Sequence, residues 1–157
     1  MKHSVTWAFI FLMVGTFIIT LPARQQEGFS LKDLNGKTIT LSDYSDKTVV
    51  VLLFWSTWSR RSKDALIRFN EYHQKYKDKG IQVIGINADN LHITDKDIKE
   101  IKTLVEELGI SYPIVLDNEL ETFHSYGIIA LPSTMVISEN KITYALPSFP
   151  LVGTEEM

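Results

Sequence analysis

Apolar and polar positions follow one another in a pattern that predicts strands joined by helices. A continuous apolar run at residues 48–54 is typical of a strand that is buried on both faces of a sheet. Ser59 is a suitable N-cap for the helix that follows, in which apolar residues recur at helical spacing to about Lys77. A second apolar run at 81–87 comes next, and we expect it to lie parallel to the first because a helix joins the two. The pattern therefore predicts a β-α-β unit at the centre of the domain.

Shorter elements are expected on both sides of this unit. Asn35-Gly36 is a strong hairpin signal, and it separates two strand-like stretches at 29–34 and 37–41. The other expected elements are a helix at 95–108, a short strand at 112–116, one or two helical turns at 122–126, and a terminal hairpin with strands at 135–137 and 142–146. Together they indicate an α/β fold with a mixed central sheet and helices on its faces.

An uncharged apolar run from Val5 to Leu21 follows the basic residue Lys2. The run is at the short end for crossing a bilayer and slightly long for the apolar core of a signal peptide. We therefore expect residues 1–23 to be a signal peptide or a membrane anchor, with the membrane contacted through residues 4–22.

The anchor is followed by a polar stretch at 24–28, which we interpret as a tether, and by a domain at 29–157. The basic residue before the apolar run favours a topology in which this domain lies outside the cytoplasm. The expected location is the periplasm or the outer face of the cell membrane.

The composition excludes several classes of function. A chain of 157 residues with 45% hydrophobic residues suits one domain with a normal core. A net charge of -3, without any Lys/Arg-rich block, argues against nucleic acid as a partner. The chain contains no cysteine, and His73, His92 and His124 fall in separate predicted elements. Since a soft metal site needs thiolates, we expect neither a metal site nor a cofactor.

Residues 54–62 lie where the first long strand gives way to the helix, and they resemble a thioredoxin active site in which both cysteines are serine. In that superfamily the helix N-terminus lowers the pKa of the first thiol and makes it a nucleophile. Ser59 and Ser62 occupy the two cysteine positions. A hydroxyl cannot form a disulfide, so the chain is not expected to exchange thiols and disulfides.

From Phe29 to about Leu146 the chain resembles the membrane-anchored thioredoxin-like proteins of the TlpA/ResA type, which are related to the AhpC/TSA redoxins. The segments that carry the resemblance are 29–37, 41–44, 54–58, the helix at 95–108 with Tyr112-Pro113 after it, 126–128 and 131–134. The resemblance implies a thioredoxin-like fold. It also implies that Pro132 is a cis-proline facing the active-site turn, next to backbone that pairs with an extended substrate.

The departures from the family pattern are concentrated at one place. Besides the two serines, Arg61 stands where a proline is often found, and Ala65 stands where a glutamate is common. Loss of this whole set favours a protein that keeps the binding scaffold without the redox chemistry. We expect it to bind an extended peptide or partner protein at the turn from Trp58 to Ser62 and at the loop that contains Pro132.

The candidate binding residues are Trp58, Arg60, Arg61, Leu131 and Pro132. Trp58 is either a binding anchor or a packing residue, whereas packing is the favoured role of Trp55. The two arginines either bind an anion at the helix N-terminus or lie solvated on the surface. Simple N-capping explains Ser59 better than a role as a hydrolytic nucleophile.

Two other functional readings remain open. In the first, the chain is a thiol-disulfide oxidoreductase of the TlpA/ResA type whose cysteines have been replaced. Ser59 would then mark the position of the nucleophile and Ser62 that of the resolving cysteine, and the role would be disulfide reduction, redox homeostasis or cytochrome c maturation. Alternatively, it is a truncated, decaying gene product. Residues 153–157 resemble the capped start of the family's final helix, so that helix is expected to be missing.

Overall fold

The computed structural model describes residues 28–139 and 141–146. The expected anchor, the tether up to Glu27 and the segment at 153–157 lie outside the described residues. Within the described part of the chain, no helix combines the length and the apolar character that a membrane crossing requires.

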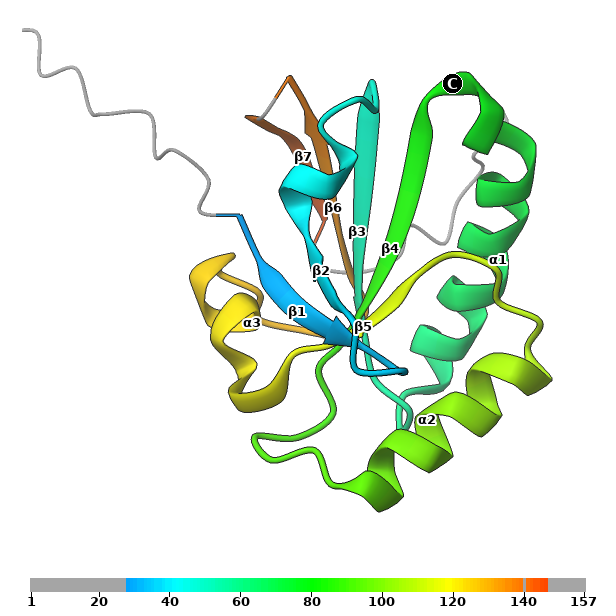
Figure 1. Ribbon diagram of the computed structural model, residues 1–157, viewed down its shortest axis with the longest axis vertical. Coiled ribbons are helices and arrows are strands. Elements are labelled where there is room, and N and C mark those ends of the chain that lie inside the picture. Colours follow the sequence, from blue (N-terminus) through cyan, green and yellow to red (C-terminus); the bar gives the residue numbers. More distant parts are fainter. Residues whose placement is uncertain (1–27, 140, 147–157) are drawn as a thin grey trace, which may run out of the picture.

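The described residues form one mixed sheet with strand order β2-β1-β5-β4-β3-β6-β7 (Figure 1). The strands are β1 (Ser30–Asp33), β2 (Thr38–Thr40), β3 (Val49–Trp55), β4 (Ile81–Asn87), β5 (Ile114–Leu116), β6 (Ser133–Ser138) and β7 (Lys141–Leu146). The helices are α1 (Arg60–Tyr76), α2 (Asp95–Glu107) and α3 (Glu121–Ser125), with short 3-10 turns at Leu41–Tyr44, Lys77–Lys79 and Asn118–Leu120.

The predicted β-α-β unit is confirmed. β3 and β4 are parallel, with Val49 opposite Ile81 and Trp55 opposite Asn87, and α1 joins them. β6 lies antiparallel on the other side of β3. Both central strands are almost fully buried, as their continuous apolar sequences predict.

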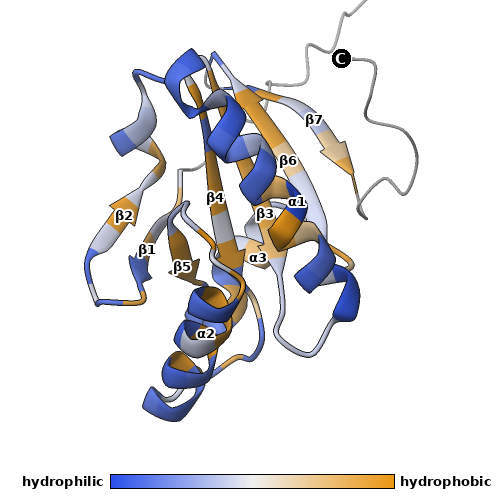
Figure 2. Ribbon diagram, turned by 90° about the vertical axis from the view of Figure 1, so that its right-hand side faces the viewer, coloured by the Kyte–Doolittle hydropathy of each residue, from blue (hydrophilic) through white to orange (hydrophobic). Residues whose placement is uncertain are grey.

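The core consists of two apolar layers, one on each face of the sheet. One layer joins β3 and β4 to α1 and α2 through residues such as Leu53, Trp55 and Ile101. The other lies under α3 and the β1–β2 hairpin and contains Phe54 and Tyr126. Apolar colour is accordingly concentrated on the central strands and on the helix sides turned towards them (Figure 2).

Local signals placed most element boundaries correctly. Gly36 has a φ of 82° in the hairpin, and Gly80 has a φ of 81° after α1, so both adopt the left-handed conformation that glycine tolerates. The predicted strand at 112–116 is shorter than expected and begins at Ile114. Pro113 has no N–H to donate to a ladder, which accounts for the later start.

Candidate functional site

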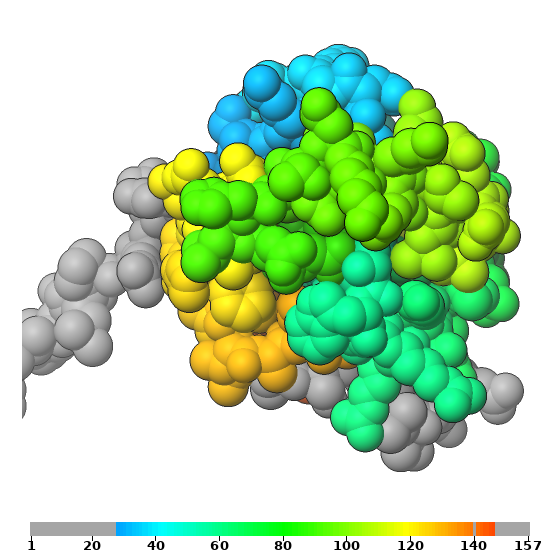
Figure 3. Space-filling model, turned by 90° about the horizontal axis from the view of Figure 1, so that it is seen from below, coloured from blue at the N-terminus to red at the C-terminus, as the bar shows by residue number. Residues whose placement is uncertain are grey.

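Three loops meet at the end of the sheet where β3 and β4 finish. The loops after these parallel strands leave from the same edge, and the loop before β6 arrives there because Ser133 pairs with Phe54. Figure 3 looks onto this end and shows the segments after β3 and β4, in teal and green, beside the yellow and orange segment that leads into β6. The fold therefore brings the predicted turn and the Pro132 loop together.

Both serines at the family's cysteine positions hold backbone groups. Ser59 is the N-cap of α1, and its hydroxyl accepts a hydrogen bond from the Ser62 N–H at 3.3 Å. Ser62 is fully buried, and its Oγ accepts a bond from the Ser56 N–H at 3.2 Å. Among the described residues, neither hydroxyl is hydrogen-bonded to a histidine or a carboxylate. The predicted N-cap role of Ser59 is confirmed, and no base of the kind that a serine nucleophile needs is bonded to either hydroxyl in the described part of the chain.

The two tryptophans of the turn have opposite environments. Trp55 is fully buried between the sheet and α1, with its indole nitrogen 3.3 Å from the position that a Cβ at Gly85 would occupy. Trp58 is 70% exposed. The favoured packing role of Trp55 is confirmed, and Trp58 lies on the surface, where a binding anchor would have to be.

Asp89 connects the loop after β4 to the turn after β3. Its carboxylate accepts hydrogen bonds from the Thr57 N–H at 2.6 Å and from the Thr57 hydroxyl at 2.8 Å. We call this pair of bonds the Thr57–Asp89 brace. An Asp in a loop after a strand is ordinary, and no local pattern indicates a partner 32 positions away.

Arg60 and Arg61 are both exposed in the first turn of α1, which contains no acidic residue. Within the described residues, neither forms an ion pair. A cation at this position opposes the helix dipole, whose N-terminus is positive. The two side chains therefore add to a positive potential beside Trp58.

The Pro132 loop has the predicted backbone form. The Leu131–Pro132 bond is cis; Pro132 is buried and Leu131 half-buried. The Ser133 hydroxyl donates a hydrogen bond to the Ala130 carbonyl at 2.6 Å. In the part of the chain that the structure describes, the main-chain N–H groups of residues 129–131 donate no hydrogen bond, so this strip can pair with another chain.

Asp117 positions the helical turn that precedes the Pro132 loop. It is fully buried at the end of β5, and its carboxylate accepts bonds from the Thr122 N–H at 3.1 Å and the Phe123 N–H at 2.7 Å. Burial raises the pKa of this carboxyl above its ordinary value, although the two backbone donors oppose the shift. Asp117 thus fixes the first turn of α3 to the end of β5.

Sequence reasoning missed two exposed apolar residues at this end of the sheet, Leu91 and Ile129. Both lie in loops, and exposure in a loop is not encoded in a periodic pattern. The histidines considered as ligands do not come together: His73 is buried on α1, while His92 and His124 are exposed in other elements. Among the described residues, no group of three or more potential metal ligands is found.

The fold and the strand-turn-helix geometry at Trp55–Ser62 define a thioredoxin-like protein. Residues 22–145 match the AhpC/TSA family, and the chain belongs to that family.

Curated relatives include the thiol-disulfide oxidoreductases ResA of Bacillus thuringiensis subsp. konkukian and Halalkalibacterium halodurans. Each is 32% identical over 74% of this chain, and the matched regions cover 64% and 62% of those proteins. The chain thus spans less than two thirds of the length of these relatives.

Solved structures share the fold at lower identity. A thiol-disulfide oxidoreductase from Bacteroides fragilis superposes with a TM-score of 0.66 at 23% identity, covering 78% of this chain and 89% of its own. StoA from Bacillus subtilis superposes with a TM-score of 0.62 at 21% identity, covering 80% and 90%.

Proposed function

We propose that this chain is a redox-inactive, thioredoxin-like binding protein located outside the cytoplasm. In this proposal it binds an extended peptide, or an extended segment of a partner protein, between the turn at Trp58–Ser62 and the Pro132 loop. The apolar run that follows Lys2 supports the location, as an anchor or an export signal.

The observation that carries the proposal is the strip of backbone N–H groups at residues 129–131, which are unused within the described residues and lie at the same end of the sheet as the exposed Trp58. An extended peptide binds to a free backbone edge by main-chain hydrogen bonds, and side-chain contacts give it specificity. Exposed tryptophans are frequent anchors in such interfaces.

The state of the two serines supports the absence of redox chemistry. Disulfide exchange requires a thiolate to attack a sulfur atom, and the chain contains no cysteine. Ser59 and Ser62 instead satisfy backbone N–H groups. The scaffold therefore persists with its two family redox positions used structurally.

The proposed absence of redox activity is tested by an insulin-reduction assay with dithiothreitol. The full chain in non-ionic detergent is compared with the Ser59→Cys/Ser62→Cys variant. We expect no acceleration by the unaltered chain and clear acceleration by the variant, whose new dithiol would reduce an insulin disulfide and be re-reduced by dithiothreitol. Activity of the unaltered chain would refute redox inactivity. Activity restored in the variant is also what the second candidate, an oxidoreductase with replaced cysteines, requires.

Peptide binding is tested directly. The probe is α-lactalbumin that has been reduced and blocked with iodoacetamide, which is extended and has no free thiol. We expect the unaltered chain to bind it and Trp58→Ala to weaken the binding by about tenfold or more. Ile67→Ala is the matched control, because Ile67 is also exposed but lies further along α1. Absence of binding by the unaltered chain would contradict the proposal.

A further inference from the structure

Large apolar side chains are exposed on all three loops around the turn. Trp58 is 70%, Leu91 57% and Ile129 83% exposed, and they account for three of the six large hydrophobic residues that are exposed among the described residues. They lie on the loop after β3, the loop after β4 and the loop before β6. We call them the apolar rim. Exposed apolar residues gathered at one end of a domain mark a surface that binds other molecules.

A pocket of about 250 Å³ lies beside the Pro132 loop. It is lined on one side by Ile128 and Ile129 and on the other by Thr134, Met135 and Leu146, among other residues. Thr134 pairs with Leu53, so its side chain lies on the α1 face of the sheet, whereas Met135 lies on the face of the pocket. The pocket therefore offers a mainly apolar lining.

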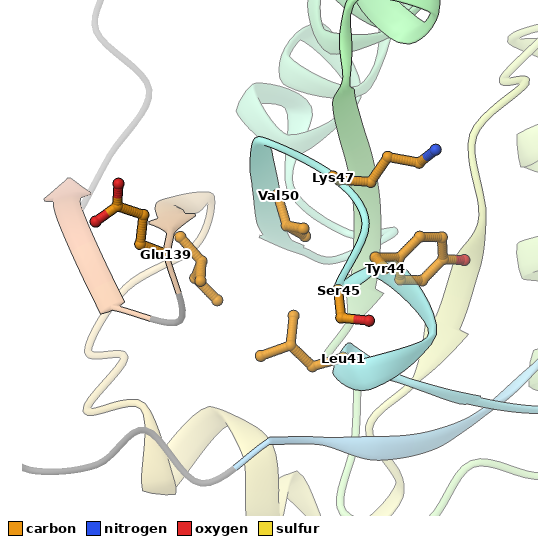
Figure 4. Close-up of a pocket in the computed structure, with 7 residues that line it drawn as sticks. Leu41, Tyr44, Ser45, Lys47, Val50 and Glu139 are labelled. Carbon is orange, nitrogen blue, oxygen red and sulfur yellow. The ribbon is translucent and has the colours of Figure 1, made fainter.

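Another pocket, of about 160 Å³, lies away from the turn between the 3-10 turn at Leu41–Tyr44 and the end of β6 (Figure 4). Lys47, at its edge, is 3.0 Å from Asp46 and forms an ion pair with it. The pocket beside the Pro132 loop is the larger of the two and is lined by Ile129 of the apolar rim, so it is the better candidate for an apolar side chain of the peptide.

Positive charge lies at the Trp58 side of the apolar rim. Arg60 and Arg61 are exposed there without an ion pair among the described residues. Asp64 on the next turn of α1, Asp89 in the Thr57–Asp89 brace and Glu119 near Leu91 are acidic, so the positive charge is confined to the first turn of α1. Since the α1 N-terminus adds to the same sign, an acidic group of the partner is favoured at this position.

We propose that the bound partner is an extended segment in which bulky apolar residues are interspersed with acidic ones. This inference depends on the peptide binding proposed above and names the chemistry of the peptide. One apolar side chain enters the pocket beside Ile129, another packs on Trp58, and a carboxylate meets Arg60 and Arg61. Alternate residues of an extended chain point to opposite sides, so a mixed sequence can make both kinds of contact.

The test uses rhodamine-labelled peptides and fluorescence anisotropy with the full chain in non-ionic detergent. The first peptide is acetyl-Asp-Leu-Glu-Phe-Asp-Leu-Glu-Phe-amide; the second has lysine at every acidic position, and the third has alanine at every apolar position. We expect the first to bind about tenfold more tightly than either of the others, and its affinity to fall with added salt.

Protein variants identify the contacts. Arg60→Gln/Arg61→Gln is expected to lower the affinity for the first peptide by about tenfold. Lys77→Gln/Lys79→Gln is the matched control, since it removes two cations just beyond the other end of α1 and is expected to change the affinity by less than about twofold.

The outcomes separate this inference from the function on which it depends. If the acidic and basic peptides bind equally, or if the arginine variant keeps full affinity, the acidic preference is wrong and peptide binding stands. If the alanine peptide binds as tightly as the first, the apolar requirement is wrong. If neither these peptides nor the unfolded α-lactalbumin probe binds, the proposed function itself fails.

Discussion

The end of the sheet that carries the turn has two layers with opposite chemistry. The inner layer consists of buried polar side chains, namely Ser56, Ser62, Asn87 and Asp117. The outer layer is the apolar rim of Trp58, Leu91 and Ile129. Polar groups inside and apolar groups outside reverse the usual arrangement of a soluble domain. The difference indicates that Ser62 and Asp117 in the inner layer hold the loops through hydrogen bonds to backbone N–H groups, whereas the outer layer is available for binding.

The largest effect is expected for Asp117→Ala in the inner layer. The change leaves the buried N–H groups of Thr122 and Phe123 without their charged acceptor. We expect a loss of about 3 kcal/mol in the free energy of unfolding, measured by urea denaturation. Glu106→Ala, on the exposed side of α2, is the control. A loss below 1 kcal/mol, taken as roughly one ordinary hydrogen bond, would contradict the role of Asp117.

The same carboxyl predicts part of the pH dependence. Burial raises the pKa of Asp117 in the folded state, so the folded protein binds its proton more tightly than the unfolded chain does. The contribution of this group to stability is therefore present at acid pH and is lost as the pH rises through the raised pKa. Asp117→Asn, which is neutral throughout, should show a smaller decline over that range. Parallel pH profiles of the two proteins would contradict the raised pKa.

Ser62→Ala is expected to have an intermediate effect in the inner layer. It removes the acceptor of the buried Ser56 N–H, so we expect the free energy of unfolding to fall by about 1–2 kcal/mol. Ser62→Cys retains an acceptor of similar shape and should cost less. Equal losses in the two variants would show that packing, and not the hydrogen bond, determines the effect.

Ser59→Ala tests the N-cap of α1, which lies between the inner and the outer layer in the sequence of the turn. Removal of the N-cap is expected to lower the free energy of unfolding by about 1 kcal/mol, and Ser59→Gly by only a few tenths. Thermal unfolding by circular dichroism gives both values. If the two variants lose the same free energy of unfolding, the N-cap hydrogen bond does not explain the contribution of Ser59 to stability.

Trp58→Ala in the outer layer is expected to have the smallest effect on stability. Because the side chain is largely in water, the free energy of unfolding should change by no more than about 0.5 kcal/mol. The same variant is expected to lose peptide affinity. A large loss of stability would place Trp58 in the packing of the domain and remove the contrast between the layers.

The central strands and helices could be predicted from the sequence, but much of the candidate site could not. The strands around Val51 and Val83, the capping role of Ser59 and the cis form of the Leu131–Pro132 bond followed from local patterns or from the family resemblance. The Thr57–Asp89 brace did not, because a hydrogen bond between two loops depends on the path of the whole chain. Leu91 and Ile129 were missed for a related reason, since exposure in a loop has no periodic signature.

The Thr57–Asp89 brace also makes the site observable by spectroscopy. An amide proton held by a carboxylate at 2.6 Å is in a short, charge-assisted hydrogen bond, and such a proton resonates far downfield in an NMR spectrum. It also exchanges with deuterated water only when the loops separate. The Thr57 amide is therefore a built-in reporter: a ligand that pushes the two loops apart shifts its signal upfield and speeds its exchange, and a ligand that lies across them slows it.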